Sequence, residues 1–139
     1  MSPIRLGALG ALTVILIAGC GDSQNRSALA KQTVQTYWKD VGTMKLHTAY
    51  QMLTPGDRSS TTESEFSQNF VAFLKTTQGL TATVGQPIVN GNNAKVPVTL
   101  HSPVTSVPKA GCQNLYWQNG TWEITDDAGG LSDPSMCKK

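Results

Sequence analysis

Cys20, Cys112 and Cys137 are the three cysteines of this 139-residue sequence and its most distinctive reactive groups. A cysteine thiolate can be acylated, oxidised to a disulfide, bound to zinc or used as a nucleophile. The cysteines form no CxxC motif, and His47 and His101 are not spaced as zinc ligands. We therefore expect no metal site and no cofactor. A reactive thiol pair stays an alternative for Cys112 and Cys137, although no neighbouring histidine supports it.

The residues before Cys20 follow the order of an export signal. Arg5 is the only charged side chain before Asp22, and the apolar run 6–19 follows it. A positive end and an apolar core orient a signal peptide in the membrane. The run is shorter than the roughly 20 residues of a comfortable membrane span. It therefore favours a cleaved signal peptide.

Residues 16–20, Leu-Ile-Ala-Gly-Cys, resemble the lipobox of bacterial lipoproteins. The resemblance implies cleavage before Cys20 and acyl chains that anchor the protein outside the cytoplasm, in the cell membrane or the outer membrane. It divides the chain into a signal peptide (1–19), a lipidated cysteine with a short polar tether (20–26) and a single domain (27–139). An uncleaved anchor and an ordinary signal peptide with an incidental cysteine are the alternatives.

Cys112 and Cys137 are left as an even pair in what is then an oxidising compartment, so we expect them to form a disulfide. It would close a loop of about 25 residues and contribute roughly 3–4 kcal/mol. The bond would hold the C-terminal tail against a strand that starts near Cys112. Only 14% of the residues are charged and the net charge is +2, which argues against a nucleic-acid partner.

Helical spacing of apolar residues predicts the elements that must position these groups. We expect helices over 27–41 and 43–53, a turn at 54–57, and a third helix that begins at the capping box of Thr62 and Glu65 and ends before Gly79. Within it, three phenylalanines and a leucine form one apolar stripe, at positions 66, 70, 73 and 74.

From residue 80 onward the pattern alternates with period two, which is typical of strands. We expect four strands with a loop over 103–111 and a tail from 126, the strands being 80–89 with a kink at Gly85-Gln86-Pro87, 94–101, 113–118 and 121–125. Asn90-Gly91 and Asn119-Gly120 are hairpin signals. The prediction is an α+β domain with three N-terminal helices packed on a curved four-stranded antiparallel sheet.

This order of elements resembles the nuclear transport factor 2-like superfamily, a cystatin-like cone-shaped α+β fold. The resemblance is carried by 49–55, where a Pro turn ends the second helix, by Glu65-Phe66 in the third helix, and by the closing hairpin 116–124. It covers roughly residues 27–126. The superfamily contains isomerases, dehydratases and many non-catalytic binding domains, so fold alone does not assign a function.

In enzymes of that superfamily the cone interior holds an acid–base pair, often Asp with His or Tyr. By resemblance the candidates are Asp40, His47, Tyr37, Tyr50 and Tyr116. Asp40 lies beside the end of the first helix, which suggests exposure. A solvated or structural role explains each candidate better, and we assign no catalytic residue.

A possible pocket at the cone mouth, for a flat or apolar ligand, would be lined by Tyr37, Tyr50, His47, Tyr116 and Trp117; packing is the alternative. The predicted function is a lipid-anchored envelope protein whose non-catalytic domain binds a partner protein or a small apolar ligand. An isomerase- or dehydratase-like enzyme is the alternative. A third is an accessory module in cell-wall metabolism, like the same fold attached to some penicillin-binding proteins.

Overall fold

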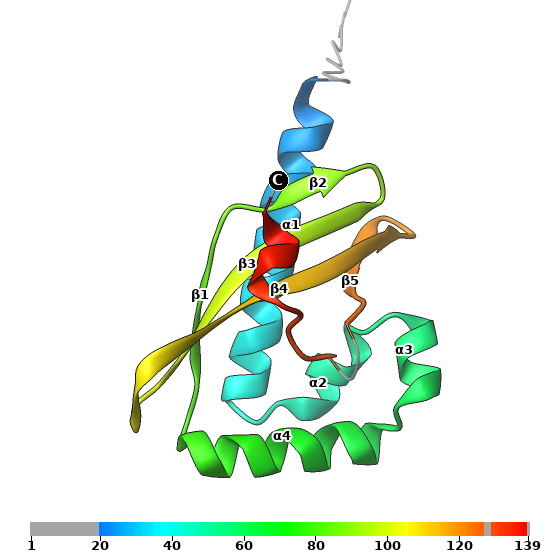
Figure 1. The fold of residues 1–139 in the computed structure, drawn as a ribbon. Helices are drawn as coiled ribbons and strands as arrows, with labels where there is room; N and C mark the ends of the chain where they lie inside the picture. The colour runs from blue at the N-terminus through cyan, green and yellow to red at the C-terminus, as the bar shows by residue number, and fades with distance from the viewer. Residues whose placement is uncertain (1–19, 127–128, 139) are drawn as a thin grey trace, which may run out of the picture.

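The computed structural model describes residues 20–126 and 129–138. The predicted signal peptide, 1–19, lies outside these residues. The chain folds as an α+β structure in which a curled antiparallel sheet, a half-barrel, is packed against helices (Figure 1). The elements in chain order are α1 (Cys20–Gly42), α2 (Leu46–Gln51), α3 (Pro55–Ser60), α4 (Glu63–Thr77), β1 (Thr81–Val84), β2 (Ile88–Asn90), β3 (Asn93–Ser102), β4 (Thr105–Gln118), β5 (Thr121–Ile124) and the 3-10 helix η2 (Pro134–Cys137).

The sheet has the strand order β1-β3-β4-β5, and β2 pairs with the other end of β3. β1 pairs with β3 from Thr81↔His101 to Val84↔Val98, and β2 pairs with residues 93–95. The strand predicted over 80–89 is therefore two strands that share one side of β3. They separate at Gly85, whose N–H donates to Pro97 O at 2.8 Å.

The hairpin predicted at Asn119-Gly120 is confirmed between β4 and β5: both residues have positive φ, 53° and 80°. The loop predicted over 103–111 is wrong, because β4 begins at Thr105 and residues 105–111 pair with β3. These residues are largely exposed, so this half of the strand carries no alternating apolar pattern. β3 and β4 thus form a long ribbon that extends beyond the body (Figure 1).

Helix α1 begins at Cys20, so the residues predicted as a tether are helical. Extending a packed helix adds one hydrogen bond per residue without a new nucleation step, which explains this difference from the predicted start at 27. The second helix is shorter than predicted because Met44 adopts φ 65° and interrupts the chain before it. The turn predicted at 54–57 opens α3, which Thr54 caps and Pro55 begins.

The capping box of α4 is confirmed: Glu65 N donates to Thr62 Oγ1 at 3.2 Å, and Thr62 N donates to Glu65 Oε2 at 2.9 Å. The helix ends at Thr77; its C-cap residue, Gln78, adopts the left-handed conformation and is followed by Gly79 at φ 115°. The predicted apolar stripe faces the interior, with Phe66, Phe70 and Leu74 buried.

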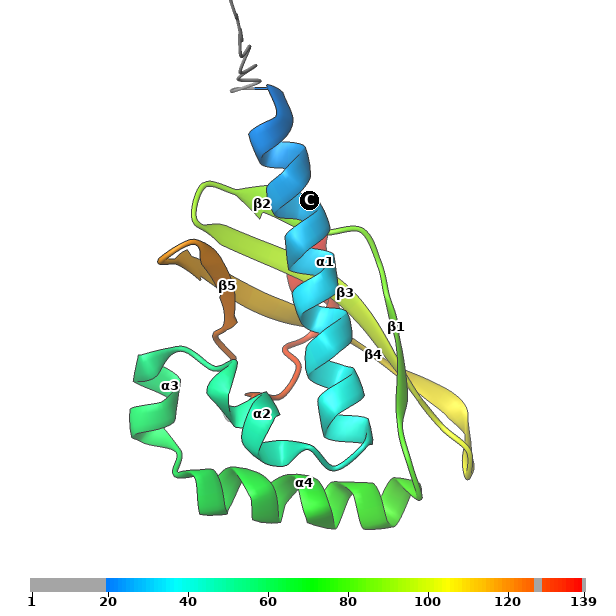
Figure 2. The same cartoon turned by 180° about the vertical axis from the view of Figure 1, so that it is seen from behind.

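One core joins α1 to the inner face of the sheet, and α4 crosses one end of it (Figures 1 and 2). The apolar side chains that α1 and the sheet contribute to this core are Ala30, Val34, Tyr37, Trp38, Val41, Val84, Ala94, Val96, Val98, Leu100, Leu115, Trp122 and Ile124. Within the described residues, no helix has the length and apolarity needed to cross a bilayer.

Candidate functional site

Gln113 is a fully buried polar side chain on the inner face of β4. Its Oε1 accepts a hydrogen bond from Trp38 Nε1 at 2.7 Å. Its Nε2 donates to Asp126 Oδ2 at 2.7 Å and to Gly130 O at 3.0 Å. A buried amide must satisfy these groups internally, and here they join α1, the sheet and the C-terminal segment.

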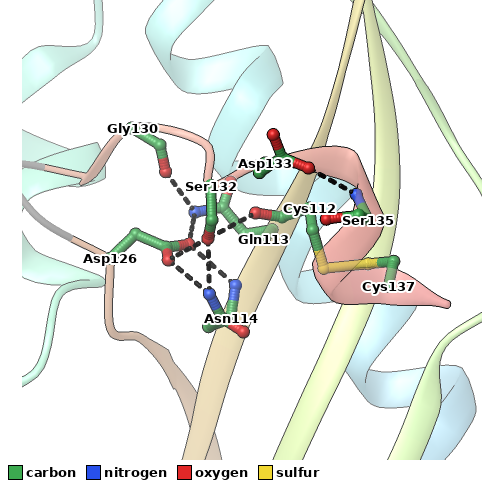
Figure 3. The surroundings of a disulfide bond; sticks show 9 residues. All are labelled: Cys112, Gln113, Asn114, Asp126, Gly130, Ser132, Asp133, Ser135 and Cys137. Carbon is green, nitrogen blue, oxygen red and sulfur yellow. Dashed lines mark hydrogen bonds between the residues drawn. A yellow bond between two sulfur atoms is a disulfide. The ribbon is translucent and has the colours of Figure 1, made fainter. Parts of the chain in front are cut away.

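Asp126 accepts hydrogen bonds at both carboxylate oxygens (Figure 3). Besides Gln113, the donors are Asn114 N at 2.7 Å, Asn114 Nδ2 at 2.6 Å and Ser132 Oγ at 3.0 Å. Burial raises the pKa of the Asp126 carboxyl, while the hydrogen bonds from Asn114, Ser132 and Gln113 oppose that rise. The carboxylate therefore acts as a fixed acceptor that orders the segment after β5.

Tyr37 lies in the centre of the core, and its hydroxyl donates to Gly129 O at 2.7 Å. Burial, and secondly the negative charge of Asp126, raise the pKa of Tyr37 well above its ordinary value. The hydroxyl is therefore a neutral donor at physiological pH, committed to a main-chain carbonyl.

Cys112 and Cys137 form a disulfide, with their Cα atoms 5.5 Å apart (Figure 3). Beside it, Ser132 and Cys112 exchange two main-chain hydrogen bonds, of 2.8 and 2.9 Å, so the segment pairs with the edge of β4. Hydrogen bonds from Ser135 lower the pKa of Asp133, which caps η2. The residues predicted as a tail are thus held to the sheet.

The five predicted pocket residues do not come together. Tyr37 is in the core, and the buried Tyr50 places its hydroxyl 2.8 Å from Arg58 O and 2.7 Å from Thr61 O. The His47 side chain is 71% exposed, with Nδ1 2.8 Å from Glu63 Oε1.

The other two pocket candidates lie on β4. Tyr116 is 38% exposed, whereas Trp117 packs edge-to-face on Trp122 and lies under the Arg26 guanidinium, 4.5 Å from the ring centroid. Trp117 therefore packs against the start of α1 and against β5.

Asp40 is buried, with 8% of its surface exposed, so the predicted exposure is wrong. The chain folds back over the end of α1, where Lys45 N donates to Asp40 O at 2.7 Å. Among the described atoms, Asp40 Oδ2 has no hydrogen-bond partner. His101, at the end of β3, lies with Nε2 3.1 Å from Thr83 Oγ1.

An apolar cleft of about 140 Å³ opens beside the Gln113 cluster. Trp38 and Phe70 form its floor with their rings packed edge-to-face, and Phe73 and Leu131 are partly exposed. The full lining is Trp38, Phe70, Phe73, Leu100, Lys109, Gly130 and Leu131. A wider groove of about 410 Å³ lies elsewhere, between the start of α1 and residues 86–87.

Sequence pattern alone does not reveal this cleft or the Gln113–Asp126 cluster. The sequence predicts a strand at Gln113, a tail at Asp126 and a loop at Lys109. No local pattern connects them, because they meet only when the C-terminal segment pairs with β4. Among the described residues, no three His, Cys, Asp or Glu side chains gather as a metal-ligand set.

No protein-family model matches this chain, and no curated protein sequence matches it either.

Proposed function

We propose that this chain is a lipoprotein of the bacterial envelope, attached through an acylated Cys20, with a non-catalytic domain that binds a partner protein. The lipobox-like residues 16–20 support the attachment, and the Cys112–Cys137 disulfide supports an oxidising compartment. The curled sheet, in which β1 and β2 share one side of β3, supports a nuclear transport factor 2-like cone.

The observation that carries the binding function is an open apolar cleft next to polar groups that are already satisfied. Asp126 accepts four hydrogen bonds, and the Tyr37 hydroxyl is bound to Gly129 O. A general base needs a free lone pair directed at a substrate, whereas these groups hold the chain together. Phe73, the partly exposed aromatic residue of the cleft, packs edge-to-face on Phe70 and leaves part of its surface open to a partner.

The dimensions of the cleft favour a protein partner over a free small molecule. Its volume of about 140 Å³ is below the roughly 300–1,000 Å³ of ligand pockets. It fits one large apolar side chain, the kind of anchor that dominates protein interfaces. The exposed Lys109 at its rim adds a positive charge, so an acidic residue beside that anchor would fit.

The test places the photo-crosslinker p-benzoylphenylalanine at Phe73 in the full-length protein in intact cells. The control places it at Val104, an exposed apolar residue outside the cleft. We expect a discrete adduct from position 73, joined at an apolar residue of the partner. Its yield should fall with Lys109→Glu and stay unchanged with Lys75→Glu, a charge reversal on the exposed side of α4.

The same preparation reports on attachment, because intact mass shows whether the mature chain starts at Cys20 and carries acyl groups. Equal adducts at positions 73 and 104, or none at 73, would contradict the binding proposal. A mature product without acyl mass would contradict the attachment, independently of the crosslinking result.

A further inference from the structure

The first turns of α1 extend beyond the body of the domain (Figures 1 and 2). Gln24 and Asn25 are exposed, whereas Arg26 and Ser27 are partly buried. The helix nevertheless continues without interruption from Cys20 to Gly42. The proposed attachment point, Cys20, thus belongs to the same continuous helix as the core residues of α1.

Arg26 joins the start of α1 to the sheet through two hydrogen bonds and a cation–π contact. Its carbonyl accepts a hydrogen bond from Trp122 Nε1 at 2.8 Å, and its Nη1 donates to Gly91 O at 3.3 Å. Its guanidinium lies 4.5 Å from the Trp117 ring centroid. These contacts reach both the β2–β3 and the β4–β5 hairpins, so they fix the direction of α1 relative to the sheet.

The distance along the helix from the proposed lipid at Cys20 to Arg26 is short. At about 1.5 Å per residue, the six steps from Cys20 to Arg26 span roughly 9 Å. The headgroup layer of one leaflet is itself roughly 5–7 Å thick, from the difference between total and hydrocarbon thickness. With a helical connection, the end of the domain that contacts Arg26 therefore lies at the lipid headgroups. A flexible connection of the same length would let the domain turn in any direction.

We infer that α1 is a rigid stalk that holds the domain upright, with the β2–β3 and β4–β5 turns against lipid headgroups. This rests on the proposed acylation of Cys20. The surface that meets the bilayer includes the exposed Asn92 and Thr121, which can hydrogen-bond to phosphate and glycerol oxygens. α4 lies at the opposite end from the start of α1 (Figure 1). α4, which carries Phe73 of the cleft, then lies away from the membrane, where a partner protein can reach it.

The test measures the depth of three labelled positions in the acylated full-length protein reconstituted into phosphatidylcholine vesicles. An NBD fluorophore is placed at Asn92→Cys or Thr121→Cys, near the turns, and at Asn69→Cys on α4 as the distal control; all three sites are exposed. The quencher is a spin label on the lipid headgroup. We expect quenching several-fold stronger at 92 and 121 than at 69.

A second variant tests rigidity. Seven helix-forming residues inserted after Ser23 lengthen the stalk by roughly 10 Å while nearly preserving its rotation. We expect this insertion to remove most of the quenching at 92 and 121. Seven Gly/Ser residues at the same place should make all three positions equal, because they remove the fixed orientation.

The outcomes separate this inference from the attachment itself. Equal quenching at all three positions in protein that carries acyl mass would overturn the stalk and leave the lipid anchor standing. Unchanged quenching after the helical insertion would overturn it too. Protein without acyl mass would overturn both the anchor and the orientation that depends on it.

Discussion

Opening the Cys112–Cys137 disulfide should destabilise the domain by about 3.5 kcal/mol. The bond closes a loop across a sequence separation of 25 residues, and the loop-entropy relation at that length gives this figure at 25 °C. Cys137→Ser is the better single substitution, because Cys137 is partly exposed. Cys112 is fully buried, so Cys112→Ser would also place a hydroxyl in the core.

The assay is urea unfolding followed by tryptophan fluorescence, with and without a reductant, on the wild type and on Cys137→Ser. We expect the wild type to lose stability on reduction and the variant to be unaffected by reductant. A loss below about 1 kcal/mol would show that the loop is already closed by other contacts in the unfolded or reduced chain, and the entropy argument would fail.

The contacts beside the disulfide give this prediction a second part. In Asp126→Ala, Gln113 Nε2 keeps Gly130 O, and Asn114 Nδ2 keeps Ser132 Oγ. Asn114 N loses its carboxylate acceptor, so we expect a loss of roughly 1–3 kcal/mol. Combined with Cys137→Ser, the losses should fall short of additivity by roughly 0.5 kcal/mol or more, because both changes free the same segment. Strict additivity would mean that the segment is not one cooperative unit.

Three further changes test separate parts of the structure. Gly129→Ala should cost roughly 2–4 kcal/mol in urea unfolding, because Gly129 has φ 75° and a Cβ would overlap the Tyr37 hydroxyl; a neutral result would contradict the packing of this turn. The pKa of Asp126 is raised in the folded state, so its contribution to stability is present below about pH 4 and is lost as pH rises through the folded pKa. The wild type should therefore lose stability relative to Asp126→Asn between pH 4 and neutrality in parallel unfolding curves, and a relative gain would refute the sign. Thr62→Ala should cost about 1 kcal/mol by removing the Glu65 N acceptor, whereas an unchanged unfolding midpoint would show that the capping box adds nothing.

Sequence pattern predicts correctly those parts of the fold whose conformation depends on residues close together along the chain. The capping box of Thr62 and Glu65 and the Asn119-Gly120 turn each depend on a few consecutive residues. Helical spacing likewise identified the buried side of α4. The first half of β4 gave no such signal, since its register comes from β3 and its side chains are largely exposed.

The candidate site cannot be predicted from local sequence pattern for the same reason, because its residues come from separate segments. Asp126 follows a strand in a stretch rich in Asp and Gly, which reads as solvated. Its burial depends on Asn114 and Ser132, which lie twelve and six residues away on separate segments. Asp40 is buried, contrary to the prediction, because the chain after α1 folds back over it. Tertiary contacts decided these positions and outweighed sequence pattern.

The long-range bonds of α1 set the order in which the chain can become native. The helix is the first described element, yet its hydrogen bonds reach 65 residues ahead to Gly91, 75 to Gln113, 92 to Gly129 and 96 to Trp122. Contacts this distant in sequence form slowly. As the chain emerges N-terminus first, α1 can contact α2 and the first strands early, but its bonds to Trp122 and Gly129 form only after the final hairpin has been made. The covering of the first helix is therefore completed by residues near the other end of the chain.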